Sequence, residues 1–268
     1  MLRTALLSLL VLLGACAGRP ELPPTLEAAI ADARRTPAFV ARDRYRHPRE
    51  TLEFFEVRPE HTVVEVWPGA GWYTEILAPY LRAQGRYVAA GFVRDPAGSA
   101  YRQRLLAEFD AKLAADPARY DRVVVAELGA PQSWQPVPAG TADRVLTFRN
   151  VHNWLASGHE REMFASFYRS LKKGGLLGVV EHRARPGTDL EQMKKSGYVT
   201  QDLVIKLATE AGFVYAGWSE INANPADSTD HPQGVWTLPP VLRLGETDRE
   251  KYLAIGESDR MTLKFIKP

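Results

Sequence analysis

The stretch that decides the fold is VVEVWPGAGWYTEILAPYL, residues 63–81. It begins with β-branched apolar residues, passes through a turn rich in glycine, and ends with apolar residues at helical spacing. Such a strand, turn and helix can hold a ligand, because glycine lets the main chain approach it closely. Trp67 stands where the first glycine of such a turn is usually found. The stretch therefore predicts a ligand-binding turn in which one residue, Trp67, has a bulky side chain.

The same alternation of strand and helix continues on both sides of this stretch. Short apolar runs predict strands at 62–67, 86–92, 121–128, 143–148, 175–182, 213–221 and 260–266. Apolar residues at i, i+3 and i+4 predict helices at 73–81, 163–171 and 200–211. Buried strands that alternate with helices indicate a mostly parallel sheet covered on both faces. The long non-helical stretch before the last strand predicts that this strand is antiparallel.

The composition is that of an ordinary globular protein. The chain has 268 residues, of which 45% are hydrophobic and 25% charged, and its formal net charge is +2. Basic and acidic residues alternate without long runs, so nothing predicts a nucleic-acid partner.

The first residues predict export. Arg3 precedes an apolar run from Ala5 to Leu13, which is too short for a membrane span of about 20 residues. The segment Leu13 to Cys16 resembles the lipobox of bacterial lipoproteins, in which the cysteine is lipidated. An ordinary signal peptide that happens to carry a cysteine is the alternative.

This resemblance divides the chain into a signal peptide (1–15), a lipidated tether beginning at Cys16 (16–24) and a main domain (25–268). Residues 25–60 form a helical extension at the start of the domain. Ala17, which is not aspartate, implies the outer membrane and hence the periplasmic side of the cell envelope. The membrane is then contacted only through the lipid.

Two motifs resemble those of class I S-adenosylmethionine-dependent methyltransferases. These are VVEVWPGAG (63–71) and LKKGGLLGVVEH (171–182), and the resemblance covers roughly residues 50–220. TFRNVHNW (147–154) and IGESDRMTLKFIKP (255–268) resemble segments of a bacterial group of predicted exported methyltransferases. The resemblance implies a Rossmann-like methyltransferase fold, S-adenosyl-L-methionine as cofactor and a small-molecule substrate.

The resemblance also implies a set of cofactor-binding positions. They are Glu65, Trp67, Gly69, Ala70, Gly71, Tyr73, Gly91 and Asn150. Two of them depart from the family's pattern. The family usually has glycine at Trp67, and it usually has an acidic residue at Gly91 that accepts hydrogen bonds from the ribose hydroxyls.

Three residues are candidates for catalysis. His152 and Asn153 follow the fourth predicted strand, and His182 ends the fifth. Histidine transfers protons near neutral pH, although a histidine that only fixes a loop is an equal alternative for His152. Neighbouring strand residues point to opposite faces, so Glu181 and His182 cannot both enter one pocket, and we choose His182.

Two further features bear on function. The irregular segment 221–240 is long for a compact domain and predicts a lid in preference to a disordered insertion. No close spacing joins His152, His182 and His231, so no metal site is predicted, and a metal-dependent enzyme is only a third hypothesis.

The sequence therefore predicts an exported, lipid-anchored, S-adenosylmethionine-dependent methyltransferase-like enzyme with an unknown acceptor. The alternative is a non-catalytic periplasmic binding or assembly protein that retains the methyltransferase fold. The absent acidic residue at Gly91 favours this alternative, whereas the polar residues at the strand ends favour an enzyme.

Overall fold

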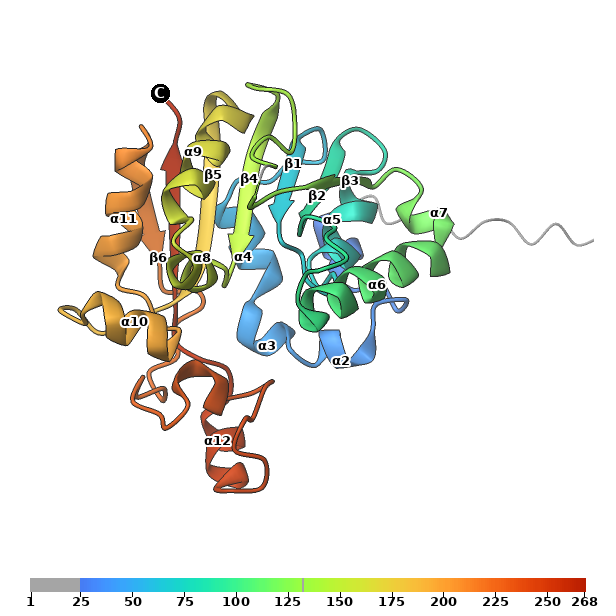
Figure 1. The fold of residues 1–268 in the computed structure, drawn as a ribbon. Coiled ribbons are helices and arrows are strands. Elements are labelled where there is room, and N and C mark those ends of the chain that lie inside the picture. The colour runs from blue at the N-terminus through green and yellow to red at the C-terminus, as the bar shows by residue number, and fades with distance from the viewer. Residues whose placement is uncertain (1–24, 132) are drawn as a thin grey trace, which may run out of the picture.

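The computed structural model describes residues 25–131 and 133–268 (Figure 1). The predicted signal peptide and tether lie outside the described residues. A single seven-stranded sheet has the order β3-β2-β1-β4-β5-β7-β6. Its strands are β1 (Thr62–Val66), β2 (Arg86–Gly91), β3 (Val124–Glu127), β4 (Ala142–Phe148), β5 (Leu171–His182), β6 (Val214–Ser219) and β7 (Arg260–Ile266).

The direction of the strands confirms the predicted topology. β1 pairs in parallel with β2 and β4, and the parallel pairing continues outward to β3 and β5. The last strand, β7, is antiparallel to both β5 and β6, and in Figure 1 its arrow points opposite to that of β5. The fold is the predicted Rossmann-like one.

Helices cover both faces and one edge of the sheet. They are α1 (Leu26–Ile30), α2 (Pro37–Val40), α3 (Asp43–Arg46), α4 (Pro48–Phe54), α5 (Thr74–Leu81), α6 (Ala100–Ala115), α7 (Pro117–Tyr120), α8 (Val151–Ser157), α9 (Glu160–Ser170), α10 (Leu190–Ser196), α11 (Gln201–Glu210), the 3₁₀ helix η1 (Gly234–Thr237) and α12 (Arg249–Ile255). No helix in the described ranges is both long and apolar enough to cross a membrane.

Alternating side chains divide the interior into two cores. Val64 and Val145 point into the core that holds α8, α9 and α11. Val63 and Leu146, one position away on the same strands, point into the core that holds α1, α4 and α5. The central strands β1 and β4 thus bury both of their faces, which is why these segments read as continuous apolar runs.

The helix predicted at 73–81 is confirmed, since α5 spans Thr74–Leu81. No helix was predicted directly after β4, but α8 begins at Val151, directly after Asn150. Tertiary packing stabilises α8, since Val151, Trp154 and Leu155 are buried in the core that also holds α9.

The order of the strands determines where a ligand can bind. The chain moves outward from β1 through β2 to β3 and then returns to β4 on the other side of β1. The connections after β1 and β4 therefore leave the sheet in different directions, and a crevice opens at their carboxyl ends. In Figure 1 the region of α2 and α3 and the region of α12 lie beyond these ends, toward the bottom of the view.

Candidate functional site

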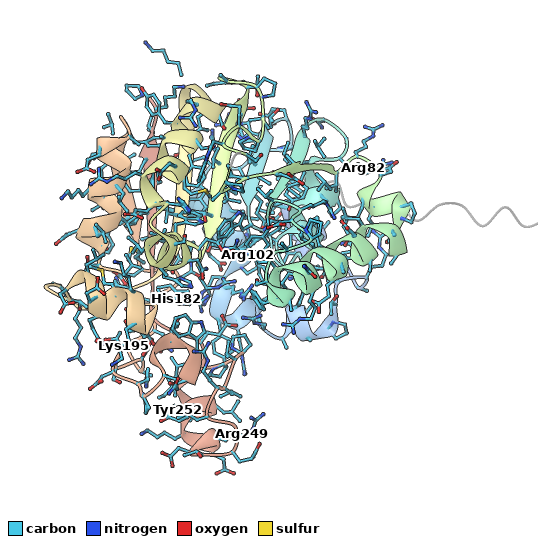
Figure 2. The ribbon with its side chains drawn as sticks, viewed as in Figure 1. Arg82, Arg102, His182, Lys195, Arg249 and Tyr252 are labelled. Atoms are coloured by element: carbon cyan, nitrogen blue, oxygen red, sulfur yellow. The ribbon has the colours of Figure 1, made fainter. Side chains whose placement is uncertain are left out.

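A cleft of about 530 Å³ lies at the carboxyl ends of β1, β4 and β5. Its lining comes from the turn after β1, the start of α8, the end of β5, the residues around α3 and the segment after η1. Figure 2 shows His182 and Arg102, which both line this cleft, near that edge of the sheet.

The glycine turn forms one wall of the cleft. Gly69 has φ of +59°, and a Cβ atom built on it would meet no atom within 4 Å. Trp67, two residues earlier, has φ of +49°. Few side chains other than glycine adopt this left-handed region, and a bulky residue is strained there. Trp67 therefore has a backbone conformation that is typical of glycine, although its side chain is an indole.

The indole of Trp67 covers the ends of β2 and β3. Its Nε1 donates a hydrogen bond to the carbonyl oxygen of Leu128 at 2.8 Å. Its ring centroid lies 4.6 Å from that of Phe92 and 5.8 Å from that of Trp154. Gly129 approaches it closely, since a Cβ there would lie 3.4 Å from the indole. The cleft thus ends at an aromatic wall on this side.

This wall decides how well the cleft fits S-adenosylmethionine. In the family that the sequence resembles, the end of β2 carries the acidic residue that holds the ribose. Here that position is Gly91, which offers no acceptor for the ribose, and the indole of Trp67 packs on Phe92 and bonds Leu128 nearby. The residues present do not fit the adenosine half of the cofactor in the family's usual pose.

Glu65 lies at the base of the turn and is buried. It accepts a hydrogen bond of 2.5 Å from the hydroxyl of Tyr87, which is itself 2.8 Å from Thr74 Oγ1. Burial raises the pKa of Glu65 to about 7, and the bond from Tyr87 only partly offsets this effect. Glu65 therefore changes its protonation near neutral pH.

His152 and Glu181 form a buried pair below the middle of the cleft. Glu181 has no exposed surface, and its Oε1 lies 3.0 Å from His152 Nδ1. The same carboxyl group accepts bonds from the backbone N–H groups of His152 and His182 at 3.3 and 2.8 Å. Because a carboxylate accepts hydrogen bonds and does not donate them, Nδ1 of His152 carries the proton. In the described chain no hydrogen bond uses its other nitrogen, Nε2.

His182 faces the cleft beside His152. The two ring centroids are 5.2 Å apart, and His182 Nδ1 shares a hydrogen bond of 2.6 Å with Ser258 Oγ. Burial lowers the pKa of His182 well below its usual range, and the neighbouring His152 and Arg149 lower it further. His182 is therefore neutral at physiological pH.

Ligand atoms of His152, Glu181 and His182 lie within 4.8 Å of one another, as in a metal site. Both oxygens of Glu181 already accept hydrogen bonds, and the arginine that lowers the pKa of His182 also repels a cation. His231 lies apart and bonds Asp227 at 2.8 Å. The cluster thus brings together two of the three histidines considered from the sequence and joins them through Glu181.

Three arginines surround one carboxylate at the other side of the cleft. Glu257 accepts a bond of 2.6 Å from Arg42 Nε, lies 3.4 Å from Arg46 Nε and 3.2 Å from a terminal nitrogen of Arg260. Burial alone would raise the pKa of Glu257, but these arginines outweigh it and lower the pKa to about 2. Arg149 lies near the same group and makes no ion pair with any described residue.

The segment predicted to be a lid forms a further wall. Val235, Trp236 and Pro239 line the cleft, and the indole of Trp236 lies 6.0 Å from His152. Asp227 anchors this segment, since it is buried and accepts bonds from Tyr198 and from the backbone of residues 229 and 259. The segment is ordered by these bonds in the described structure.

Most of the residues chosen from the sequence line the cleft. These are Glu65, Trp67, Gly69, Ala70, Tyr73, Asn150, His152, Asn153 and His182. Two do not. A Cβ on Gly71 would meet Lys112 and Phe109 of α6, and Gly91 lies against Leu106 of the same helix.

Sequence reasoning missed Arg42 and Arg46. The two arginines are four residues apart, so a single helical turn presents them together. The run ARDRYRH (41–47) is the only local signal for them. Nothing in the sequence connects that run to a cleft formed by residues 65–260, because the contact is tertiary.

Comparison with known proteins shows the fold. No family model and no curated protein matches the chain. Among solved structures, a SAM-dependent methyltransferase from Aquifex aeolicus has a TM-score of 0.57 at 15% identity, covering 85% of this chain and 93% of that one. A geranyl diphosphate methyltransferase in complex with SAM has a TM-score of 0.53 at 15% identity, covering 90% and 95%.

The same fold is also found in a protein named for another reaction. The [4+2]-cyclase SpnF has a TM-score of 0.54 at 18% identity, covering 82% of this chain and 78% of that one. At such identities the likeness shows a methyltransferase-like fold and leaves the reaction to be argued from the site.

Proposed function

We propose that this chain is an exported, lipid-anchored enzyme of methyltransferase-like fold that moves a proton from one atom to another of a small molecule bound in the cleft, with His152 Nε2 taking up the proton and returning it. The observation that carries the proposal is the His152–Glu181 pair. Glu181 holds the imidazole through Nδ1 at 3.0 Å, and Nε2 is left without a partner among the described residues of the cleft. A histidine held in this way accepts a proton from a bound ligand.

Neighbouring groups support this role. His182 lies 5.2 Å from His152 and is neutral, so it adds no positive charge that would prevent His152 from taking a proton. Glu181 stabilises the imidazolium that forms, because its carboxylate is already desolvated and oriented. Trp236 and Tyr73 provide apolar walls that limit the access of water.

A comparison of two histidine variants tests the proposal. The full-length chain, purified in detergent, is incubated with a bacterial metabolite mixture that is followed by liquid chromatography with mass spectrometry, because an isomer has the mass of its precursor. We expect a compound that wild type consumes and His152→Gln does not, while His61→Gln consumes it at the wild-type rate. His61 lies at the opposite, amino edge of the sheet, next to β1. If wild type binds a compound and consumes none, the protein is a binding protein.

Export and lipidation rest on the sequence around Cys16. The test is fractionation of cells that produce wild type or Cys16→Ser. Wild type is expected in the outer-membrane fraction with a mass increased by the lipid. Cys16→Ser is expected to be absent from that fraction and to lack the lipid mass. A soluble wild-type protein would exclude the anchor.

Methyl transfer from S-adenosylmethionine is the second candidate. It is favoured by the turn at Gly69, which remains open, and by Glu65 and Asn150 beside it in the cleft. Calorimetry with S-adenosylmethionine and S-adenosylhomocysteine on the full-length chain separates the two candidates. Because Trp67 fills the adenosine side, we expect no binding at millimolar ligand. Micromolar binding would establish the second candidate and overturn the first.

A further inference from the structure

The cleft carries more positive than negative charge. Arg42, Arg46 and Arg260 share one carboxylate, that of Glu257, and Arg149 adds a fourth guanidinium. Arg46, Arg260 and Glu257 are almost completely buried, with side-chain exposures of 3%, 2% and 5%. Positive charges grouped this closely away from bulk water repel each other strongly. A bound anion would remove that repulsion.

Arg149 is the member of this group without a partner. It follows the last residue of β4, and its backbone N–H donates to the carbonyl oxygen of Val180 at 2.7 Å. Its guanidinium lines the cleft, and within the part of the chain that the structure describes it makes no hydrogen bond. Burial lowers the pKa of Arg149 to about 10, and Arg260 adds to this effect, yet the group is still charged at neutral pH. Partial burial of this charge without a protein partner costs some stability, but its nitrogens stay accessible to solvent and to a ligand.

The backbone of Arg149 adds to this cost. Its φ is +62°, in the left-handed region that glycine adopts more easily than other residues. Strain of this kind persists at sites where the side chain has a function. Fold stability alone would favour glycine at this position, so the guanidinium requires another explanation.

We infer that the cleft recognises its substrate through an anionic group, a carboxylate or a phosphate, bound by the guanidinium of Arg149 beside Arg46. This inference adds a substrate class to the proposed function and rests on the cleft being the binding site of that enzyme. Arginine suits the role because its planar fork donates two parallel hydrogen bonds to such groups.

The rest of the substrate meets aromatic side chains. Tyr73 and Phe148 line the cleft next to Arg149 in a stacked pair, with centroids 3.7 Å apart and planes at 16°. The indole of Trp72 lies under Arg46, whose guanidinium carbon is 4.8 Å from the ring centroid. The ligand that fits this surface has an apolar or aromatic body that ends in the anion.

The test uses two anions and a neutral molecule of similar shape. Benzoate, inorganic phosphate and benzamide are titrated into the full-length chain in detergent by calorimetry. Benzoate binding identifies a carboxylate site, phosphate binding identifies a phosphate site, and benzamide is expected to bind much more weakly than the anion preferred. Binding should also weaken with added salt.

Variants assign the binding to Arg149. Arg149→Gly is expected to weaken the anion at least about tenfold, because it removes a bidentate charged contact. Arg149→Lys keeps the positive charge but not the planar guanidinium, so its anion affinity should fall by less than that of Arg149→Gly. Arg86→Ala removes an equal charge at the start of β2, at the opposite edge of the sheet, and should bind as wild type does. Since glycine suits a φ of +62°, Arg149→Gly should fold at least as stably as wild type.

Two outcomes would overturn the inference. One is a folded Arg149→Gly that binds the anion with wild-type affinity, and the other is wild type that binds neither anion at tens of millimolar. Failure of the proposed function is distinguishable from both. In that case His152→Gln and wild type would convert no compound, while the anion would still bind wild type and be lost in Arg149→Gly.

Discussion

The two ends of the cleft differ although both lie at the same edge of one sheet. At the ends of β2 and β3, the indole of Trp67 packs on Phe92 and bonds Leu128, and this end is closed by aromatic contacts. At the ends of β4 and β5, Arg149, His152 and His182 face the cleft. The end at which related folds hold adenosine is closed, and the end that remains open is charged. A fold can thus persist while the ligand it accepts changes.

Replacing Glu181 is expected to have the largest effect on the charged end of the cleft. Glu181→Leu leaves His152 Nδ1 and two backbone N–H groups without their acceptor in a fully buried place. We expect the free energy of unfolding in urea to fall by roughly 3–5 kcal/mol, as for one broken partner of a buried pair. Glu181→Gln, which keeps an acceptor oxygen, is the control and should lose clearly less. Equal losses in both variants would mean that packing, and not hydrogen bonding, is what Glu181 supplies.

Glu65, between the two ends, connects stability to pH. Its pKa is about 7 in the folded chain and 4.5 in its ordinary state, so folding favours the protonated form. The stability it contributes is complete below pH 4.5 and is lost as the pH rises through 7. By the size of this shift the loss is roughly 3 kcal/mol. Glu257 acts in the opposite direction but only below pH 4.5, because its folded pKa is about 2.

Urea unfolding of wild type and Glu65→Gln between pH 5 and 8 measures this effect. The stability of wild type relative to Glu65→Gln should fall between pH 5 and about 7, because the amide does not titrate and every other group, including His182, is common to both proteins. Tyr87 can still donate to the amide oxygen in the variant. Parallel curves for the two proteins would contradict the raised pKa.

The smallest expected effect tests whether the closed end can be reopened. Trp67→Gly restores the residue that suits a φ of +49° and removes the indole from the ends of β2 and β3. We expect the variant to bind S-adenosylhomocysteine measurably at millimolar ligand, where wild type does not, a gain of at least about tenfold or about 1.4 kcal/mol. Trp218→Ala, on the exposed edge strand β6, is the matched control. Unchanged affinity in a folded Trp67→Gly would show that Gly91, and not the indole, limits binding.

The sequence predicted strands better than helices. All seven strands lie within a few residues of their predicted positions, since each is a short apolar run and the central ones are buried on both faces. The longest helix, α6 (Ala100–Ala115), was missed because Phe109 is its only buried residue and it has almost no apolar stripe. Its Ser99 cap and its content of alanine, leucine, glutamate and lysine were the signal that could have found it.

The candidate site divides in the same way. Glu65, Gly69, His152 and His182 were chosen from the sequence because they follow strands whose carboxyl ends meet at one edge. The partnership of His152 with Glu181 was not predicted, since it joins α8 to the buried face of β5 across 29 positions. Arg42 and Arg46 reach the cleft from the helical extension, 211 or more positions from Glu257.

The sequence by itself determined the seven strands, the antiparallel direction of the last one and the edge at which polar residues gather, because these depend on local periodicity and on glycine at a turn. Only the tertiary structure decided that Trp67 closes one end of that edge and that four arginines meet at the other. The physical reason is that charge and packing act through space. A guanidinium is paired or left without a partner according to what folds against it, and no short stretch of sequence contains that information.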